Sequence, residues 1–219
     1  MVKNLDRFLK RLSKGLLAGV LTLVLVGMGG LMMPHSALAA TAGASLSETM
    51  DLKISKAAQQ FAAAILEEYQ DALEDSFSST LKPLKSVTKD LTKQLSKVAV
   101  SPTGDTATLA PKIAASQAAL EAATQSFDTL VADSDAFKKA LAAAPDQLKA
   151  ALETQLGTKF ADLQTAFDGV SKALATLTKD TSAIEGSDVT AAVGRLTEDS
   201  TTLAQAIELA KTVISSFGD

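Results

Sequence analysis

The sequence predicts an all-α fold: an elongated antiparallel up-and-down bundle of four to five long helices, preceded by an N-terminal signal peptide. Helix-forming residues dominate after residue 40, whereas Gly and Pro are sparse there. Apolar residues recur at helical intervals, and no stretch alternates apolar and polar residues as a strand does. The interruptions are short, which favours antiparallel helices joined by short loops.

Residues 1–39 have the pattern of a secretory signal peptide. A basic head is followed by an apolar run from Leu16 to Met33 and by the small-residue triplet Ala37-Leu38-Ala39. The basic residues are Lys3, Arg7, Lys10, Arg11 and Lys14. We expect cleavage after Ala39, which leaves Ala40 as the first mature residue. An uncleaved membrane anchor is the alternative, because about 18 apolar residues is the lower limit for a spanning helix.

The signal segment predicts export. Its basic head should stay on the cytoplasmic side, so the remainder is translocated to the periplasm or the extracellular space. The PHSALA tail, from Pro34 to Ala39, and the helical composition after it resemble in class the exported proteins of cyanobacteria, including small helical lumenal subunits. This resemblance implies the thylakoid lumen as a further destination.

Residues 40–219 are long enough for a single helical domain with its own core. The whole chain has 21 basic and 25 acidic residues, of which the signal holds five and one, so the mature part carries 16 and 24 and a net charge of −8. This charge argues against nucleic acid and anionic membranes as partners. The chain has no cysteine, so its stability depends on packing without disulfides.

The first helix is expected from about Ser47 to Phe77. Its apolar face holds Met50, Ile54, Ala57, Phe61, Ile65, Leu73 and Phe77. A second helix after Pro83 carries Leu84, Val87, Leu91, Leu95 and Val98. The apolar phase continues across Ser78 to Pro83, so one long kinked helix remains an alternative to two.

Loop residues at 101–108 precede a third helix that starts near Pro111, with Ile113, Leu120 and Phe127 seven residues apart. We expect Asp133-Ser134-Asp135 to cap a separate short segment, and Pro145 to start a helix that runs to about Lys179. A loop from Asp180 to Gly186 should follow.

The last helix, capped by Ser187 or Asp188, has the most regular pattern. Its heptad series is Val189, Leu196, Leu203, Ala210 and Phe217, and a second series interleaves at Val193, Ser200, Ile207 and Ile214. This 3-4 spacing predicts coiled-coil-like packing, with Ser200 as the polar exception. We expect Gly169 and Gly194, which lie within helices, to allow close helix contact.

Two charged clusters are candidate sites. Glu67, Asp71 and Glu74 share one helical face and form a weak cation candidate, although a solvated face is the simpler interpretation. Lysines recur every three or four residues at Lys82, Lys85, Lys89, Lys93 and Lys97. This basic stripe could bind an acidic partner or lipid headgroups; the alternative, which we favour, is that it pairs with the acidic cluster on a neighbouring antiparallel helix.

The residue types present exclude much chemistry. The only histidine, His35, leaves with the signal, so the mature chain lacks the Glu-x-x-His pairs of di-iron sites and every His or Cys ligand for structural zinc. It also lacks a histidine base, a G-x-S-x-G elbow and a Gly-rich phosphate loop. We therefore expect no catalytic residues and no cofactor, and the chain is not expected to be an enzyme.

Three function hypotheses follow. The favoured one is a non-catalytic exported bundle that acts by protein–protein contact, as a scaffold or accessory subunit with an unknown protein partner. The alternative is a bundle that binds lipid or a membrane surface through amphipathic helices, and the net charge and the absence of Trp weigh against it. An enzyme ranks third.

Overall fold

The computed structural model describes residues 42–100, 109–184 and 189–218, and within them every regular element is an α-helix. The helices are α2 (Ala42–Val100), α3 (Leu109–Ala142), α4 (Asp146–Leu156), α5 (Lys159–Ser182) and α6 (Val189–Ser215). The all-α prediction is therefore confirmed for this part of the chain. The predicted signal peptide, its cleavage residues Ala37, Ala39 and Ala40, and the predicted loop at 101–108 lie outside the described residues.

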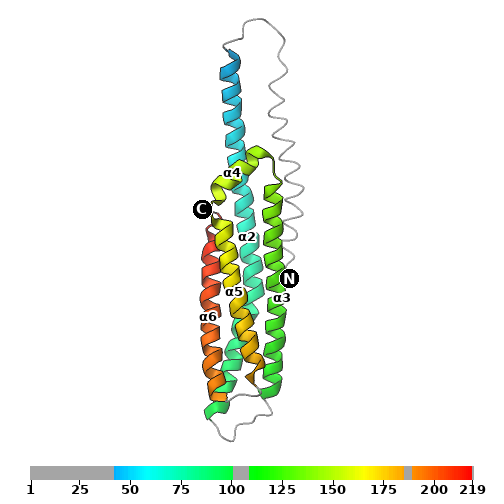
Figure 1. Cartoon of the computed structure of the whole chain (residues 1–219), viewed down its shortest axis with the longest axis vertical. Coiled ribbons are helices and arrows are strands. Elements are labelled where there is room, and N and C mark those ends of the chain that lie inside the picture. The colour runs from blue at the N-terminus through cyan, green and yellow to red at the C-terminus, as the bar shows by residue number, and fades with distance from the viewer. Residues whose placement is uncertain (1–41, 101–108, 185–188, 219) are drawn as a thin grey trace.

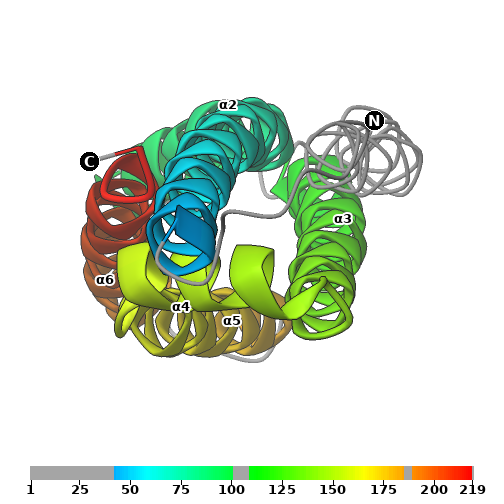
Figure 2. The same ribbon diagram turned by 90° about the horizontal axis from the view of Figure 1, so that it is seen from above.

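The long helices α2, α3, α5 and α6 lie side by side along the long axis of the molecule (Figure 1). α2 packs against α3 and α6, and α5 packs against the same two helices, so each long helix has two long neighbours. The short α4 crosses one end of this array and packs on α2, as the view from above shows (Figure 2). Beyond α4, the first turns of α2 project past the other helices (Figure 1).

α2 is continuous through Ser78 to Pro83, which decides between the two alternatives that the sequence left open. Proline has no backbone N–H, so the helical hydrogen bond to the carbonyl four residues earlier is missing at Pro83. The buried apolar stripe nevertheless runs without interruption through Phe77, Leu81 and Leu84. Packing of this stripe outweighs the local cost of the proline.

Three expectations about helix boundaries and glycines are wrong. α3 runs straight through Asp133 to Asp135, because Ser134 is buried and hydrogen bonds to Tyr69 instead of capping a new segment. The single helix expected from Pro145 to Lys179 is divided into α4 and α5 at Gly157, whose φ is +49°. A Cβ atom at Gly169 or Gly194 would meet nothing within 4 Å, so neither glycine marks a close helix contact.

An aromatic cluster ties together the end of the array nearest α4. Tyr69 of α2 stacks on Phe137 of α3 with ring centroids 3.8 Å apart, and meets the edge of Phe217, beyond α6, at 5.5 Å. Phe160 of α5 lies 6.1 Å from Tyr69 and 5.4 Å from Phe217. The Tyr69 hydroxyl and Ser134 Oγ are 2.8 Å apart, which satisfies both buried oxygens. Burial raises the pKa of Tyr69, so its phenol stays neutral.

A second aromatic cluster lies farther along the same helices. Phe127 of α3 makes edge contacts with Phe77 of α2 at 6.1 Å and with Phe167 of α5 at 5.2 Å, and Phe77 stacks on Phe167 at 5.9 Å. Together the two clusters contain every aromatic residue of the chain except Phe8 and Phe61. The core is therefore aromatic at these two levels and filled mainly by Leu, Ile, Val and Ala elsewhere.

We predict that Gly157→Ala lowers the free energy of unfolding by about 1–3 kcal/mol, because a Cβ is strained at this positive φ. Gly169→Ala is the matched control: it lies inside α5 with open space around it, and should stabilise by about 0.5–1 kcal/mol. Urea denaturation of the two variants tests this prediction. Equal effects in both would contradict the assigned role of Gly157.

A double-mutant cycle tests the Tyr69–Ser134 hydrogen bond. Tyr69→Phe and Ser134→Ala should each destabilise by about 1–3 kcal/mol, because each leaves a buried oxygen without this partner. The double variant should be less destabilised than the sum of the two, since both oxygens are then removed. Strict additivity in urea denaturation would show that the bond contributes nothing specific.

Candidate ligand-binding groove

A groove of about 860 Å³ lies between α2 and α6. Its lining extends on α2 from Phe77 to Ser96 and on α6 from Thr197 to Lys211. Phe77, Leu81, Leu84 and Leu203 form a buried floor, whereas the lysines at its margin are exposed. At 1.5 Å per residue, the α2 side is about 28 Å long. The groove is therefore long and narrow, with an apolar floor and polar margins.

A contact between Glu74 and Ser215 shows which residues of α2 and α6 lie opposite each other across the groove. Ser215 Oγ lies 3.3 Å from Glu74 Oε1. α2 and α6 are antiparallel, so residue numbers rise along α2 where they fall along α6 (Figure 1). Thr92 on α2 and Thr197 on α6 are each 18 residues from their member of the pair. These two threonines therefore lie at about the same level along the groove.

All the apolar lining residues lie in one half of this register. The half near the Glu74–Ser215 contact is lined by Phe77, Leu81, Leu84, Leu203, Ala204 and Ile207, with Ser78, Lys82, Glu208 and Lys211 as its polar residues. The far half is lined only by hydroxyl and lysine side chains: Thr88, Lys89, Thr92, Lys93, Ser96, Thr197, Ser200 and Thr201. The groove is thus amphipathic along its length.

Most of the far-half hydroxyls already donate a hydrogen bond to their own helix. Thr88, Thr92 and Ser96 donate to the carbonyl four residues earlier at 2.8–2.9 Å, as do Thr197 and Thr201 at 2.7–2.8 Å. Their oxygens can still accept a bond. Ser200 Oγ differs, because it is buried and has no partner among the described residues.

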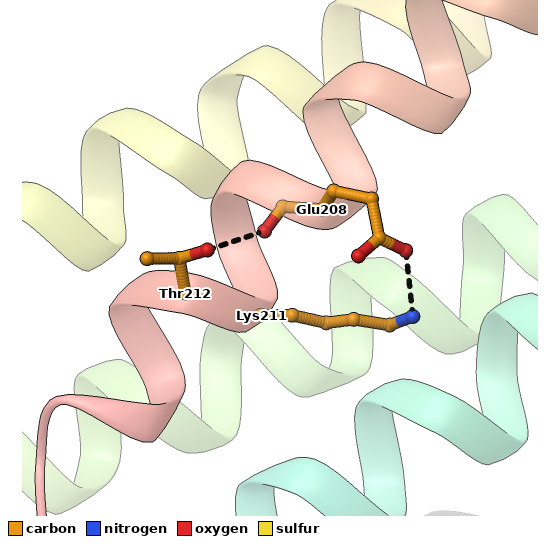
Figure 3. Close-up of polar contacts among 3 residues, drawn as sticks. All are labelled: Glu208, Lys211 and Thr212. Atoms are coloured by element: carbon orange, nitrogen blue, oxygen red, sulfur yellow. Dashed lines mark hydrogen bonds and ion pairs between the residues drawn. The ribbon is translucent and has the colours of Figure 1, made fainter.

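Charges are distributed unequally at the two ends. In the apolar half, Lys211 Nζ donates to Glu208 Oε1 at 2.8 Å, so the two charges compensate each other (Figure 3). Thr212 Oγ1 also donates to the Glu208 backbone carbonyl at 3.0 Å (Figure 3). In the far half, Lys89 and Lys93 are exposed and make no ion pair within the described part of the chain. Lys82 is the remaining charged lining residue of the apolar half, so the far half, with two lysines and no acidic residue, carries the larger positive charge.

The predicted basic stripe lies partly on this groove. Lys82, Lys89 and Lys93 line it, Lys97 is exposed beyond it, and the side chain of Lys85 lies outside the described residues. The expected pairing with the acidic cluster on an antiparallel neighbour is wrong, because both clusters belong to the one helix α2. The sequence thus located one margin of the groove but not its floor.

Glu67, Asp71 and Glu74, the weak cation candidate, are all exposed on α2. Glu74 Oε1 accepts hydrogen bonds from Gln70 Nε2 and from Ser215 Oγ. Within residues 42–100, 109–184 and 189–218, no group of three or more acidic or histidine side chains is arranged to hold a metal ion. No helix in those ranges is both long and apolar enough to cross a membrane.

Outside the groove lining, two carboxyl groups from the neighbouring helices α5 and α6 lie together. Asp199 of α6 hydrogen bonds with Asp180 of α5, and Arg195 Nε lies 4.0 Å from Asp180 Oδ2. Burial, and next the hydrogen bond and charge of Asp180, raise the pKa of Asp199 to about 6. Neither aspartate lines the groove, so the pair bears on stability rather than on ligand contact.

Comparison with known proteins gives no match to a family model, a curated protein or a solved structure. The groove must therefore be interpreted from its own residues. Sequence reasoning missed its hydroxyl lining. The signal was present in the four-residue spacing of Thr88, Thr92 and Ser96, which repeats at Thr197 and Thr201 beside the polar exception Ser200.

We predict that Asp199→Asn raises the thermal midpoint at pH 7.5 and that this gain shrinks toward pH 4.5. An acid whose pKa is raised in the folded state binds more protons than the unfolded chain between about pH 3.8 and 6, so wild-type stability falls as pH rises through this window. Thermal unfolding at both pH values measures the difference. Asp168→Asn, at an exposed aspartate of α5, is the control; the same profile in both variants would contradict the prediction.

Proposed function

We propose that this chain is an exported, non-catalytic helical bundle of the antiparallel up-and-down type, which binds single-chain amphiphiles in the α2–α6 groove. The observation that carries the proposal is the separation of the groove into an apolar half and a hydroxyl- and lysine-lined half. Its volume of about 860 Å³ falls in the range of small-molecule sites, roughly 300–1,000 Å³.

The dimensions suit a slender occupant. The volume of about 860 Å³ is spread over a length of about 28 Å. An extended hydrocarbon chain is much narrower than a helix and fits within the groove along its whole length.

The net charge supports capture of single molecules rather than attachment to a membrane surface. The mature chain carries a net charge of −8, which repels an anionic bilayer as a whole. Lys82, Lys89 and Lys93 provide local positive charge at the groove. Of the two forms of the lipid hypothesis, we therefore favour binding of a single amphiphile between α2 and α6 over attachment to a membrane surface.

Protein–protein contact, which the sequence favoured, remains the second candidate function. The first turns of α2 project beyond α4 (Figure 1), and Leu52 is 68% exposed there beside the exposed Lys53 and Lys56. An exposed leucine flanked by lysines on a projecting helix suits contact with an acidic protein surface.

Filling the groove tests the proposed function. Ala204 lines the groove from α6, so Ala204→Trp should weaken binding of the fluorescent fatty acid cis-parinaric acid at least about tenfold, because the indole occupies the ligand's space. Ala191→Trp is the matched control, since Ala191 is exposed on the same helix and does not line the groove. It should bind like the wild type.

Fluorescence titration below the micellar concentration measures both variants, and thermal unfolding checks that each is folded. No saturable binding to the wild type would contradict the proposal, as would equal binding by the two variants. Co-isolation of a protein partner, together with absence of amphiphile binding, would support the second candidate instead.

A further inference from the structure

The far half of the groove can receive an anionic head. Lys89 and Lys93 are one helical turn apart on α2, exposed, and without an ion pair in the described residues. Opposite them, α6 presents Thr197, Thr201 and the buried, unpartnered Oγ of Ser200. Two ammonium groups with a free hydroxyl provide the charge and the hydrogen-bond donors that a carboxylate needs.

The near half is less suited to receive an anionic head, because it has one lysine without an ion pair where the far half has two. It contains the six apolar lining residues, and its Lys211 is already paired with Glu208 at 2.8 Å. A carboxylate placed there would meet a compensated ion pair and a hydrocarbon floor, which is unfavourable without new hydrogen bonds. Lys82 lines the margin of this half, two turns from Lys89, and is its one lysine without an ion pair in the described residues.

Acidic residues do not cancel the positive end within the groove. Asp90 and Glu198 are exposed near it but do not line the groove, and Asp199 is hydrogen bonded to Asp180 away from the lining. Positive charge along the groove is therefore greater at the hydroxyl end, with Lys89 and Lys93, than at the apolar end, with Lys82 and the Lys211–Glu208 pair.

We infer that the groove binds a long-chain fatty-acid carboxylate in one orientation, with the carboxylate between Lys89, Lys93 and Ser200 and the chain end near Phe77 and Ile207. This inference rests on the proposed function and specifies both its ligand class and its polarity. The carboxylate replaces its water contacts by ammonium and hydroxyl groups, and the chain covers the apolar floor from water.

Headgroup selectivity tests the first part of the inference. Palmitate and hexadecanol have the same chain, and only palmitate is charged, so each is used to displace cis-parinaric acid. Wild type should bind palmitate about tenfold more tightly than hexadecanol, and Lys89→Gln/Lys93→Gln should reduce this preference to about twofold or less. Lys82→Gln should retain most of the preference.

The outcomes separate the two claims. Binding of both compounds with equal affinity to wild type would overturn the carboxylate assignment and leave the amphiphile groove intact. A larger loss in Lys82→Gln than in the double variant would overturn the orientation. Binding of neither compound would overturn the inference together with the proposed function.

Paramagnetic broadening tests the orientation directly. Stearate with a nitroxide at carbon 5 should broaden amide signals of Thr197 and Thr201, and stearate with a nitroxide at carbon 16 should broaden those of Ile207 and Lys211. The reverse pattern would overturn the inference. Equal broadening by both probes would do the same, because it would mean that the ligand has no fixed polarity.

Discussion

The stacking of Tyr69 against its aromatic neighbours is the constraint on which the rest of the structure depends. One side chain from α2 contacts rings from α3, from α5 and from the residues after α6, so four segments distant in sequence are fixed at one level. The hydrogen bond to Ser134 restricts the ring further, because both buried oxygens need a partner. The cluster thereby sets the register of the long helices.

Register at this end determines what the helices present to each other farther along. Around Tyr69 and Phe77, large rings fill the space between helices. Several turns beyond Tyr69, α2 presents Thr88, Thr92 and Ser96 where α6 presents Ser200 and Thr201. These side chains are small, and the groove extends between them.

The lysines on α2 show how the same pattern changes meaning with tertiary context. In the sequence they form a stripe with two interpretations, a paired face or an interaction surface. Because α2 is one continuous helix, the acidic cluster Glu67, Asp71 and Glu74 belongs to the same helix as the lysines. The two clusters therefore cannot pair across a contact between antiparallel helices. What remains is a positive margin beside an apolar floor, which gives the groove a direction as well as a volume.

The sequence by itself determined the helical class and the buried faces, because both depend on local spacing. Leu196, Leu203, Ala210 and Phe217 are buried as predicted, and so are Ile113, Leu120 and Phe127, whereas Val189, Val193 and Ile207 are half-buried and Ala57, expected on the apolar face of the first helix, is exposed. Only the tertiary structure decided the continuity of α2 through Pro83, the use of Ser134 as a partner of Tyr69 and the break at Gly157. It also decided that two hydroxyl series, centred on Thr92 of α2 and on Thr197 and Thr201 of α6, face each other across a groove. The physical reason is that local spacing fixes which face of a helix is apolar, whereas the neighbour that covers this face, and the space left uncovered, depend on packing between residues far apart in the chain.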